Sequence, residues 1–196
     1  YSTTNIQVEG VDEPDLVKND GKYIYVIAGN QVIIVDAYPA ESMEVLSEIN
    51  ISNAFEMFIN EDRLIVFSND YKQYSETIAS IYDISDRSEP ELEKKISIEG
   101  NYITARMIDD YVYLIANQYT GYDDIILPYV AVDGVRKEIP ATDIAYFPYP
   151  DTNYVFTNIL AINVENGNYE SKTYLLGASY NIYVSSYQHL EESKLH

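Results

Sequence analysis

Acidic side chains are the residues of this chain whose type and spacing could do chemistry. Three groups of carboxylates stand out: Asp12, Glu13 and Asp15; Asp109 and Asp110; Asp123 and Asp124. Hard oxygen ligands of this kind suit Ca²⁺, although the spacing of an EF-hand is absent. The N-terminal group of Asp12, Glu13 and Asp15 is the best candidate for a calcium site. Its alternative is an ordinary linker that leads into the first strand.

Tyrosines form a second group of candidate residues. Tyr119, Tyr122, Tyr146 and Tyr149 fall in one long predicted loop, residues 118–154. Tyrosine rings offer a large contact area at low entropic cost. These four residues therefore predict a ligand-binding platform for a sugar, a peptide or an apolar group. The alternative is that the rings pack against the prolines of the loop as a small core.

Several kinds of catalytic site are disfavoured by the sequence. Histidine occurs only at positions 189 and 196, and cysteine is absent, which argues against Ser-His-Asp, Cys-His and His-rich zinc sites. No glycine-rich phosphate loop is present. We therefore assign no catalytic residues and no certain cofactor. Glycoside hydrolysis by a pair of carboxylates stays open, although so many acids produce pairs by chance.

The charge balance limits the partners. Asp and Glu number 32 against 12 Lys and Arg, which gives a net charge of −20. Nucleic acid is not expected as a partner, because phosphate contacts need clustered Lys and Arg. The negative net charge fits a solvated surface. The more specific interpretations of this charge are cation binding, basic partners or a salty habitat. No apolar stretch is long enough for a transmembrane segment.

The elements that must position these residues repeat along the chain. Three aromatic and β-branched segments recur: Tyr23–Ala28, Leu64–Ser68 and Val112–Ala116. Each is preceded by a shorter strand and followed by a second apolar strand and then a polar, alternating one. A period of roughly 40 to 50 residues is typical of propeller blades, and this gradient from buried to half-solvated strands fits a blade.

The sequence therefore predicts an all-β fold, an incomplete β-propeller of about three four-stranded antiparallel blades plus the start of a fourth. The expected blades span about 16–52, 54–99 and 102–177, the last with the insertion 118–154, and the fourth begins at about 180–196. Helical periodicity between the strands is not visible, which argues against a TIM barrel or a Rossmann fold.

The insertion is the main departure from the repeat. It enlarges the connector between the second and third strands, and within it Val130–Val135 predicts a small hairpin. A long loop on a repetitive scaffold is the default place to look for function. We expect the insertion on the rim next to the channel mouth; the alternative is a cap over the blade edges.

The N-terminal segment Ser2–Tyr25, which contains Val11-Asp12-Glu13-Pro14-Asp15, resembles the opening of secreted C-terminal β-propeller proteins of archaea and bacteria, distantly related to WD-type repeats. The segments Asp36–Pro39, Tyr82–Asp86 and Ile139–Ile144 resemble the same family. The resemblance extends to about Tyr187 and implies an extracellular or cell-surface propeller, with no catalytic residues to carry over. Members of that family continue through further blades, so we expect this chain to be a fragment.

These observations predict a non-enzymatic module outside the cell that binds a protein or a cell-surface component. Two alternatives stay open: a propeller hydrolase or lyase whose site is completed by missing blades, and a purely structural surface module. The first and last blades of the fragment lack neighbours. We therefore also expect self-association through open blade edges.

Overall fold

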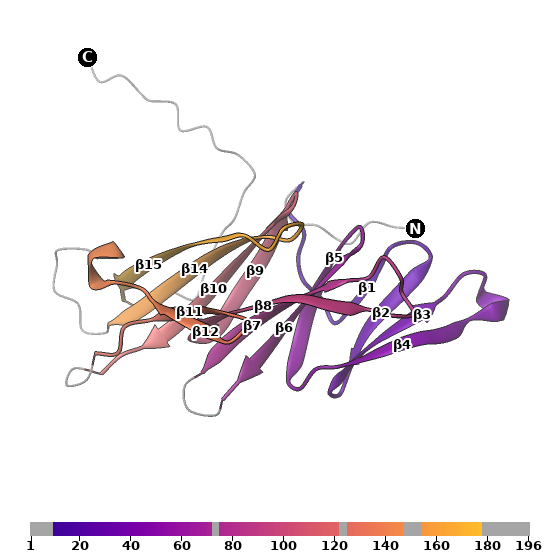
Figure 1. Cartoon of the computed structure of the whole chain (residues 1–196), viewed down its shortest axis with the longest axis horizontal. Coiled ribbons are helices and arrows are strands. Elements are labelled where there is room, and N and C mark those ends of the chain that lie inside the picture. The colour runs from indigo at the N-terminus through magenta and orange to yellow at the C-terminus, as the bar shows by residue number, and fades with distance from the viewer. Residues whose placement is uncertain (1–9, 72–74, 122–124, 147–153, 178–196) are drawn as a thin grey trace, which may run out of the picture.

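The computed structural model describes residues 10–71, 75–121, 125–146 and 154–177. Within these ranges the chain is all-β, as predicted, and forms three sheets that lie side by side (Figure 1). Only two short 3₁₀ turns interrupt the described strands, η1 (Ala40–Ser42) and η2 (Ala141–Asp143).

Each sheet contains four antiparallel strands in chain order, although in sheet 3 the insertion separates the second strand from the third. Sheet 1 consists of β1 (Val17–Asn19), β2 (Tyr23–Ala28), β3 (Gln31–Asp36) and β4 (Glu44–Asn50). Sheet 2 is built on β5 (Ala54–Asn60), β6 (Arg63–Asp70), β7 (Glu76–Asp83) and β8 (Glu91–Glu99). Sheet 3 is built on β9 (Asn101–Ile108), β10 (Tyr111–Tyr119), β14 (Val155–Asn163) and β15 (Tyr169–Leu176).

The predicted strand order therefore occurs three times, with a short or inner strand first and a more polar strand last. The strands of the insertion join sheets 2 and 3 at one edge. They are β11 (Tyr129–Val132), β12 (Val135–Glu138) and β13 (Ile144–Tyr146). The expected start of a fourth blade, about 180–196, lies outside the described residues.

Sheet 2 is buried on both faces because it lies between the other two sheets. In β6, Ile65 and Phe67 belong to the core shared with sheet 3, while Leu64 and Val66 belong to the core shared with sheet 1. Successive side chains of a strand point to opposite faces. An uninterrupted apolar run is therefore what a strand with two buried faces requires.

The passage from sheet 2 to sheet 3 is tight at Gly100. Its backbone has φ +124°, and a Cβ at this position would lie 2.9 Å from the backbone carbon and oxygen of Asn117 in β10. A glycine is needed both for this backbone conformation and for the close approach of the two strands. The two sheets are thus held face to face directly after β8.

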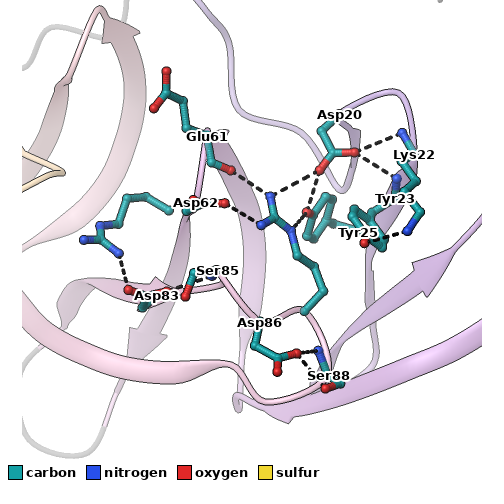
Figure 2. Close-up of polar contacts among 12 residues, drawn as sticks. Asp20, Lys22, Tyr23, Tyr25, Glu61, Asp62, Asp83, Ser85, Asp86 and Ser88 are labelled. Atoms are coloured by element: carbon teal, nitrogen blue, oxygen red, sulfur yellow. Dashed lines mark hydrogen bonds and ion pairs between the residues drawn. The ribbon is translucent and has the colours of Figure 1, made fainter.

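Arg87, in the loop between β7 and β8, ties sheet 1 to sheet 2. Its partners Tyr25, Glu61 and Asp62 are labelled in Figure 2. Its Nε donates to the Tyr25 hydroxyl at 3.2 Å, its Nη2 donates to the Glu61 carbonyl at 3.1 Å, and its Nη1 pairs with the Asp62 carboxylate. The Tyr25 hydroxyl donates in turn to Asp20 at 2.9 Å. One guanidinium therefore joins the loop of sheet 2 to the buried face of sheet 1.

We expect Arg87→Ala to lower the free energy of unfolding by about 2–4 kcal/mol, because the buried Tyr25 hydroxyl and the Asp62 carboxylate lose a charged donor. Arg87→Lys should restore only part of this loss, because the compact ammonium group of lysine cannot donate to several acceptors at once as the planar guanidinium does. Urea denaturation checks the order of stability. The matched control is Lys95→Ala on the exposed side of β8, and equal stability of the Arg87→Ala and Lys95→Ala proteins would contradict the prediction.

Candidate binding cleft

The insertion extends two sheets at their outer edges (Figure 1). β11 and β12 form the predicted hairpin, which turns at Asp133 (φ 49°) and Gly134 (φ 83°) and pairs with β8 through Val130 and Ile98. Positive φ at both turn residues is the requirement of a type I′ turn, one of the two common two-residue hairpin loops. β13 pairs in parallel with β15. The insertion thus lies at the ends of the sheets where each repeat finishes.

The expected position of the insertion next to the channel mouth is therefore wrong for its described strands. The opposite, inner edges are formed by β5 and β9, and the segment before β1 pairs with both of them. Asp15 exchanges backbone hydrogen bonds with Met57 of β5, and Asp12 does so with Met107 of β9. β8 and β15 offer the free backbone edges, so the insertion strands pair there.

A cleft of about 420 Å³ lies between the two extended edges. β12 contributes Lys137 and Glu138 to one wall, and β15 contributes residues 169 and 171–173 to the other. The turn η2 and the preceding segment 139–140 close one side. Small-molecule sites have volumes of about 300–1,000 Å³. The insertion has therefore created a cleft large enough for a small ligand or for part of a polymer.

Strand register fixes which side chains face the cleft. Lys137 is the cross-strand partner of Val130, and Val130 is buried in the core between sheets 2 and 3. Directly paired residues of antiparallel strands share a face, so Lys137 faces sheet 3. From the opposite side, Tyr169 packs against the same core. The cleft is thus an outward continuation of the space between the two sheets.

A chain of buried hydrogen bonds supports the floor of the cleft. The Thr173 hydroxyl donates to Asn158 Oδ1 at 2.7 Å, and Asn158 Nδ2 donates to the backbone carbonyl of Glu99 at 3.0 Å. Thr173 is 1% exposed and Asn158 is fully buried. A satisfied buried polar network holds its members in one geometry. The wall formed by β15 is therefore fixed relative to β8.

The charged groups of the cleft have few partners. Among the described Lys and Arg residues, only Lys95, Lys137 and Lys172 lack a hydrogen bond or ion pair of the side chain. Lys137 faces the cleft, whereas Lys172 is paired with Ile159 and lies with Glu170 on the opposite face of β15. Glu138 also has no side-chain partner among the described residues, but it is paired with Tyr129 and lies on the hairpin face opposite to Lys137. The cleft therefore presents the ammonium group of Lys137 to a ligand.

A second polar cluster lies on the opposite face of the hairpin. Glu76 and Glu99 are directly paired across β7 and β8. The Tyr129 hydroxyl donates to Glu76, and Arg136 Nη2 donates to the same carboxylate at 2.8 Å while its guanidinium lies 4.3 Å from the centre of the Tyr129 ring. These contacts fasten the hairpin to β7.

Glu99 is the unusual member of this cluster. It is 3% exposed, and its Oε2 has no hydrogen-bond partner. Burial raises the pKa of the Glu99 carboxyl to about 7, an effect that Arg136 opposes and Glu76 reinforces. The charge of Glu99 therefore changes near neutral pH, directly beneath the hairpin that forms one wall of the cleft.

The two predicted tyrosines that the structure describes, Tyr119 and Tyr146, do not share one surface. Tyr119 is 56% exposed at the end of β10, and Tyr146 is 71% exposed at the end of β13. The two strands are separated by β14 and β15, or roughly 14 Å at the usual strand spacing. Their register places them on opposite faces of sheet 3. Tyr122 and Tyr149 lie outside the described residues, so the binding role of the four stays a prediction.

The acidic N-terminal group is occupied by ion pairs. Lys18 Nζ lies 2.9 Å from Asp12 Oδ1, and Arg106 Nη2 lies 3.2 Å from Glu13 Oε1. The Asp15 carboxylate accepts from the backbone N–H of Leu16. Within the described ranges, no three His, Cys, Asp or Glu side chains come together as a group that could hold a metal ion. Calcium binding by Asp12, Glu13 and Asp15 stays a prediction.

Comparison with known proteins settles the family. The model of the beta propeller domain family matches residues 1–190. The chain belongs to this family. The resemblance noted for the N-terminal segment is thus confirmed, and the three face-to-face sheets are consistent with a propeller. In the described part of the propeller, no helix is long and apolar enough to cross a membrane.

Two curated relatives are archaeal and uncharacterised. A protein of Methanocaldococcus jannaschii is 26% identical over 202 residues, a match that covers 100% of this chain and 30% of the relative. A protein of Archaeoglobus fulgidus is 23% identical over 197 residues, covering 91% of this chain and 29% of the relative. The propeller chain thus spans about three-tenths of the length of these relatives. No solved structure matches it.

The raised pKa of Glu99 predicts a pH-dependent stability. The pKa in the folded protein, about 7, lies above the ordinary value of 4.5, so the folded protein holds this proton more tightly. The free energy of unfolding should therefore fall as pH rises from about 4.5 to about 7 and stay lower above that range. Glu99→Gln cannot ionise, so it should be more stable than the unmodified chain at about pH 8.5, by about 1–2 kcal/mol after solvent screening.

Urea denaturation of both proteins at about pH 4.5 and about pH 8.5 measures this difference. Glu138→Gln, an exposed change on the same hairpin, is the control and should behave alike at both values. A stability difference for Glu99→Gln that is the same at both pH values would show that Glu99 ionises normally.

Proposed function

We propose that this chain is a non-enzymatic binding module of a larger propeller, which binds a protein or a cell-surface component outside the cell. The observation that carries the proposal is the cleft between the outer edges of sheets 2 and 3, because the insertion alone builds one of its walls. The extracellular location is supported by the resemblance of the N-terminal segment to secreted propellers.

The form of the cleft supports binding of part of a large molecule. It is open to solvent, and most of its lining is polar: Lys137, Glu138, Thr142, Asp143, Ser171, Lys172 and Thr173. Polar groups that have no partner within a protein are available to a ligand. A rim site of this kind is also accessible to a polymer, whose ends can extend beyond the cleft on either side.

The alternative function is a hydrolase or lyase completed by further blades. The observation that favours it is the Glu76–Glu99 pair, since a carboxylic acid with a pKa near 7 beside a carboxylate is the arrangement that glycosidases use. The burial of Glu99, which a substrate could not reach, argues against this alternative. Glu99 is 3% exposed and lies on the face of the hairpin opposite to the cleft, where a substrate would have to displace the hairpin.

Blocking the cleft tests the binding proposal. Ser171 is half-buried and lines the cleft, whereas its neighbour Glu170 is exposed and does not. We expect the unmodified chain to bind ligands on arrays of glycans and surface proteins, and Ser171→Trp to abolish this binding because the indole fills the cleft. Glu170→Trp, on the other face of the same strand, is the matched control and should bind normally.

Two outcomes would overturn the binding proposal. Binding that survives in Ser171→Trp would place the ligand elsewhere on the propeller. If the unmodified chain, with its fold verified by circular dichroism, bound nothing on the arrays, the proposal that it is a binding module would be overturned.

A further sheet of the complete protein is the proposed neighbour of sheet 1. One face of sheet 1 packs on sheet 2 through residues such as Tyr25 and Ile34, whereas the other face carries an apolar row that no described residue covers. That row consists of Val17, Ile24, Val26, Ile33, Val35 and Val45. Sheets 1 and 2, and sheets 2 and 3, already pack face to face, and the relatives contain about three times as much chain.

The same face predicts association of this chain when it is produced alone. We expect the unmodified chain to form dimers or larger species at a concentration of roughly tens of micromolar, because exposed apolar faces of sheets associate. Ile33→Glu should shift sedimentation toward the monomer. Lys95→Gln on the exposed side of β8, which changes the net charge by the same amount, serves as a control. A purely monomeric unmodified chain would contradict this prediction.

A further inference from the structure

We propose that the cleft binds an extended segment of another protein, which adds as a strand to the open edge of β15. The inference rests on the proposed function, because it names the ligand class of the same cleft. In this mode of recognition, main-chain hydrogen bonds at an open strand edge provide the affinity, and contacts to alternate side chains provide the specificity. The walls of the cleft supply both.

The edge of β15 is open over the first half of the strand. β13 pairs only with Thr173–Leu175, so the edge from Tyr169 to Lys172 has no strand partner among the described residues. This open part lies in the cleft. β13 shows that a strand fits beside β15, and an added strand would continue its line. Unpaired N–H and C=O groups along such an edge are a template for pairing with another chain.

The hydrogen-bond pattern identifies the backbone groups that face the cleft. The N–H of Asn163 donates to the carbonyl of Asn168 at 2.8 Å, where β14 turns into β15. Hydrogen-bonded and non-hydrogen-bonded pairs alternate along an antiparallel ladder. The backbone groups of Glu170 therefore bond to β14, whereas those of Tyr169 and Ser171 point to the open edge. An extended peptide offers complementary donors and acceptors at the same spacing.

Side chains around the open edge select the sequence of the peptide. Lys137 faces sheet 3 across the cleft, and its ammonium group has no partner among the described residues. An acidic side chain of the peptide would pair with it, and no existing ion pair need be broken. Tyr169 and Ile139 line the same space and pack against the core between sheets 2 and 3, so they suit an apolar side chain.

These contacts predict a pattern in the ligand. Every second residue of a strand lies on the same face, so an acidic and an apolar residue should stand at alternate positions of the peptide. The net charge of −20 limits the number of acids, because a highly acidic segment would be repelled. Acids of the protein that lie farther from the bound residue than the Debye length, about 8 Å at physiological ionic strength, are screened. A segment with one acid near Lys137 therefore fits best.

Selection from a peptide library tests this inference. The probe is a phage-displayed library of short random peptides, panned on the unmodified chain. We expect the selected peptides to share an acidic and an apolar residue at alternate positions, and synthetic copies to bind with a dissociation constant below about 1 mM in titration calorimetry. Ser171→Trp should abolish this binding, because the indole fills the cleft. Glu170→Trp, on the other face of β15, should bind the peptides normally.

N-methylated peptides test strand addition without changing the protein. The selected peptide is made in two forms, one methylated on the N–H groups of its odd residues and the other on those of its even residues. Alternate N–H groups of an extended strand point to opposite edges. One form should therefore lose its hydrogen bonds to β15 and bind at least about tenfold more weakly, while the other should bind like the unmethylated peptide.

Lys137 and the acidic residue of the peptide should act as one pair. Lys137→Gln, and replacement of the peptide acid by its amide, should each weaken binding about three- to fivefold. The two changes together should weaken it no further than either one alone, because they remove the same ion pair. Lys95→Gln, which removes a lysine of β8 outside the cleft, is the matched control and should leave the affinity unchanged.

Failure of the ligand class and failure of the site give different results. Selection of no peptide, or equal effects of the two methylation patterns, would overturn strand addition, while array ligands that still depend on Ser171 would leave the proposed function intact. Undiminished peptide binding by Lys137→Gln would overturn the pairing with an acidic residue. Peptide binding that persists in Ser171→Trp would overturn the cleft as the site.

Discussion

Face-to-face packing of thin sheets is the constraint on which the rest of this structure depends. A single sheet cannot bury its own apolar faces, so each sheet needs a neighbour. Sheet 2 has two neighbours, and its central strand β6 is therefore apolar at four successive positions, Leu64–Phe67. Gly100 and Arg87 act at the two ends of this arrangement: the glycine allows sheets 2 and 3 to approach, and the arginine joins sheets 1 and 2. The cleft exists only because the space between sheets 2 and 3 continues outward beyond their cores.

The strands could be predicted from the sequence because their pattern is local. Tyr23–Ala28 was expected as a strand and is β2, and the Asp133-Gly134 turn was expected within a hairpin and joins β11 to β12. Turn residues and apolar runs act within a few residues of the chain. The repeat then indicates which strands belong to one sheet.

The candidate site could not be predicted in this way, because its residues meet through pairing between distant strands. Lys137 and Ser171 stand far apart in the sequence, and neither belongs to a motif. From the sequence alone, Glu99 is only the polar end of an alternating strand. The strand register in the structure shows that it lies beside Glu76 and beneath Tyr129. The acidic group of Asp12 and Glu13 was visible in the sequence, but the cations that pair with it come from β1 and β9.

The position of the insertion follows from the edges that the repeat leaves open. Unpaired strand edges promote association with other chains, and proteins commonly cover them. The segment before β1 pairs with β5 and β9, whereas nothing in the basic repeat covers β8 or β15. Strands β11 and β13 cover these two edges, and the chain that connects them must cross the gap between sheets 2 and 3. A wall across that gap, lined by the polar side chains of an edge strand, is the direct result. Protection of the edges and formation of the cleft are therefore one structural event, and a site of this kind needs no change in the repeated sheets themselves.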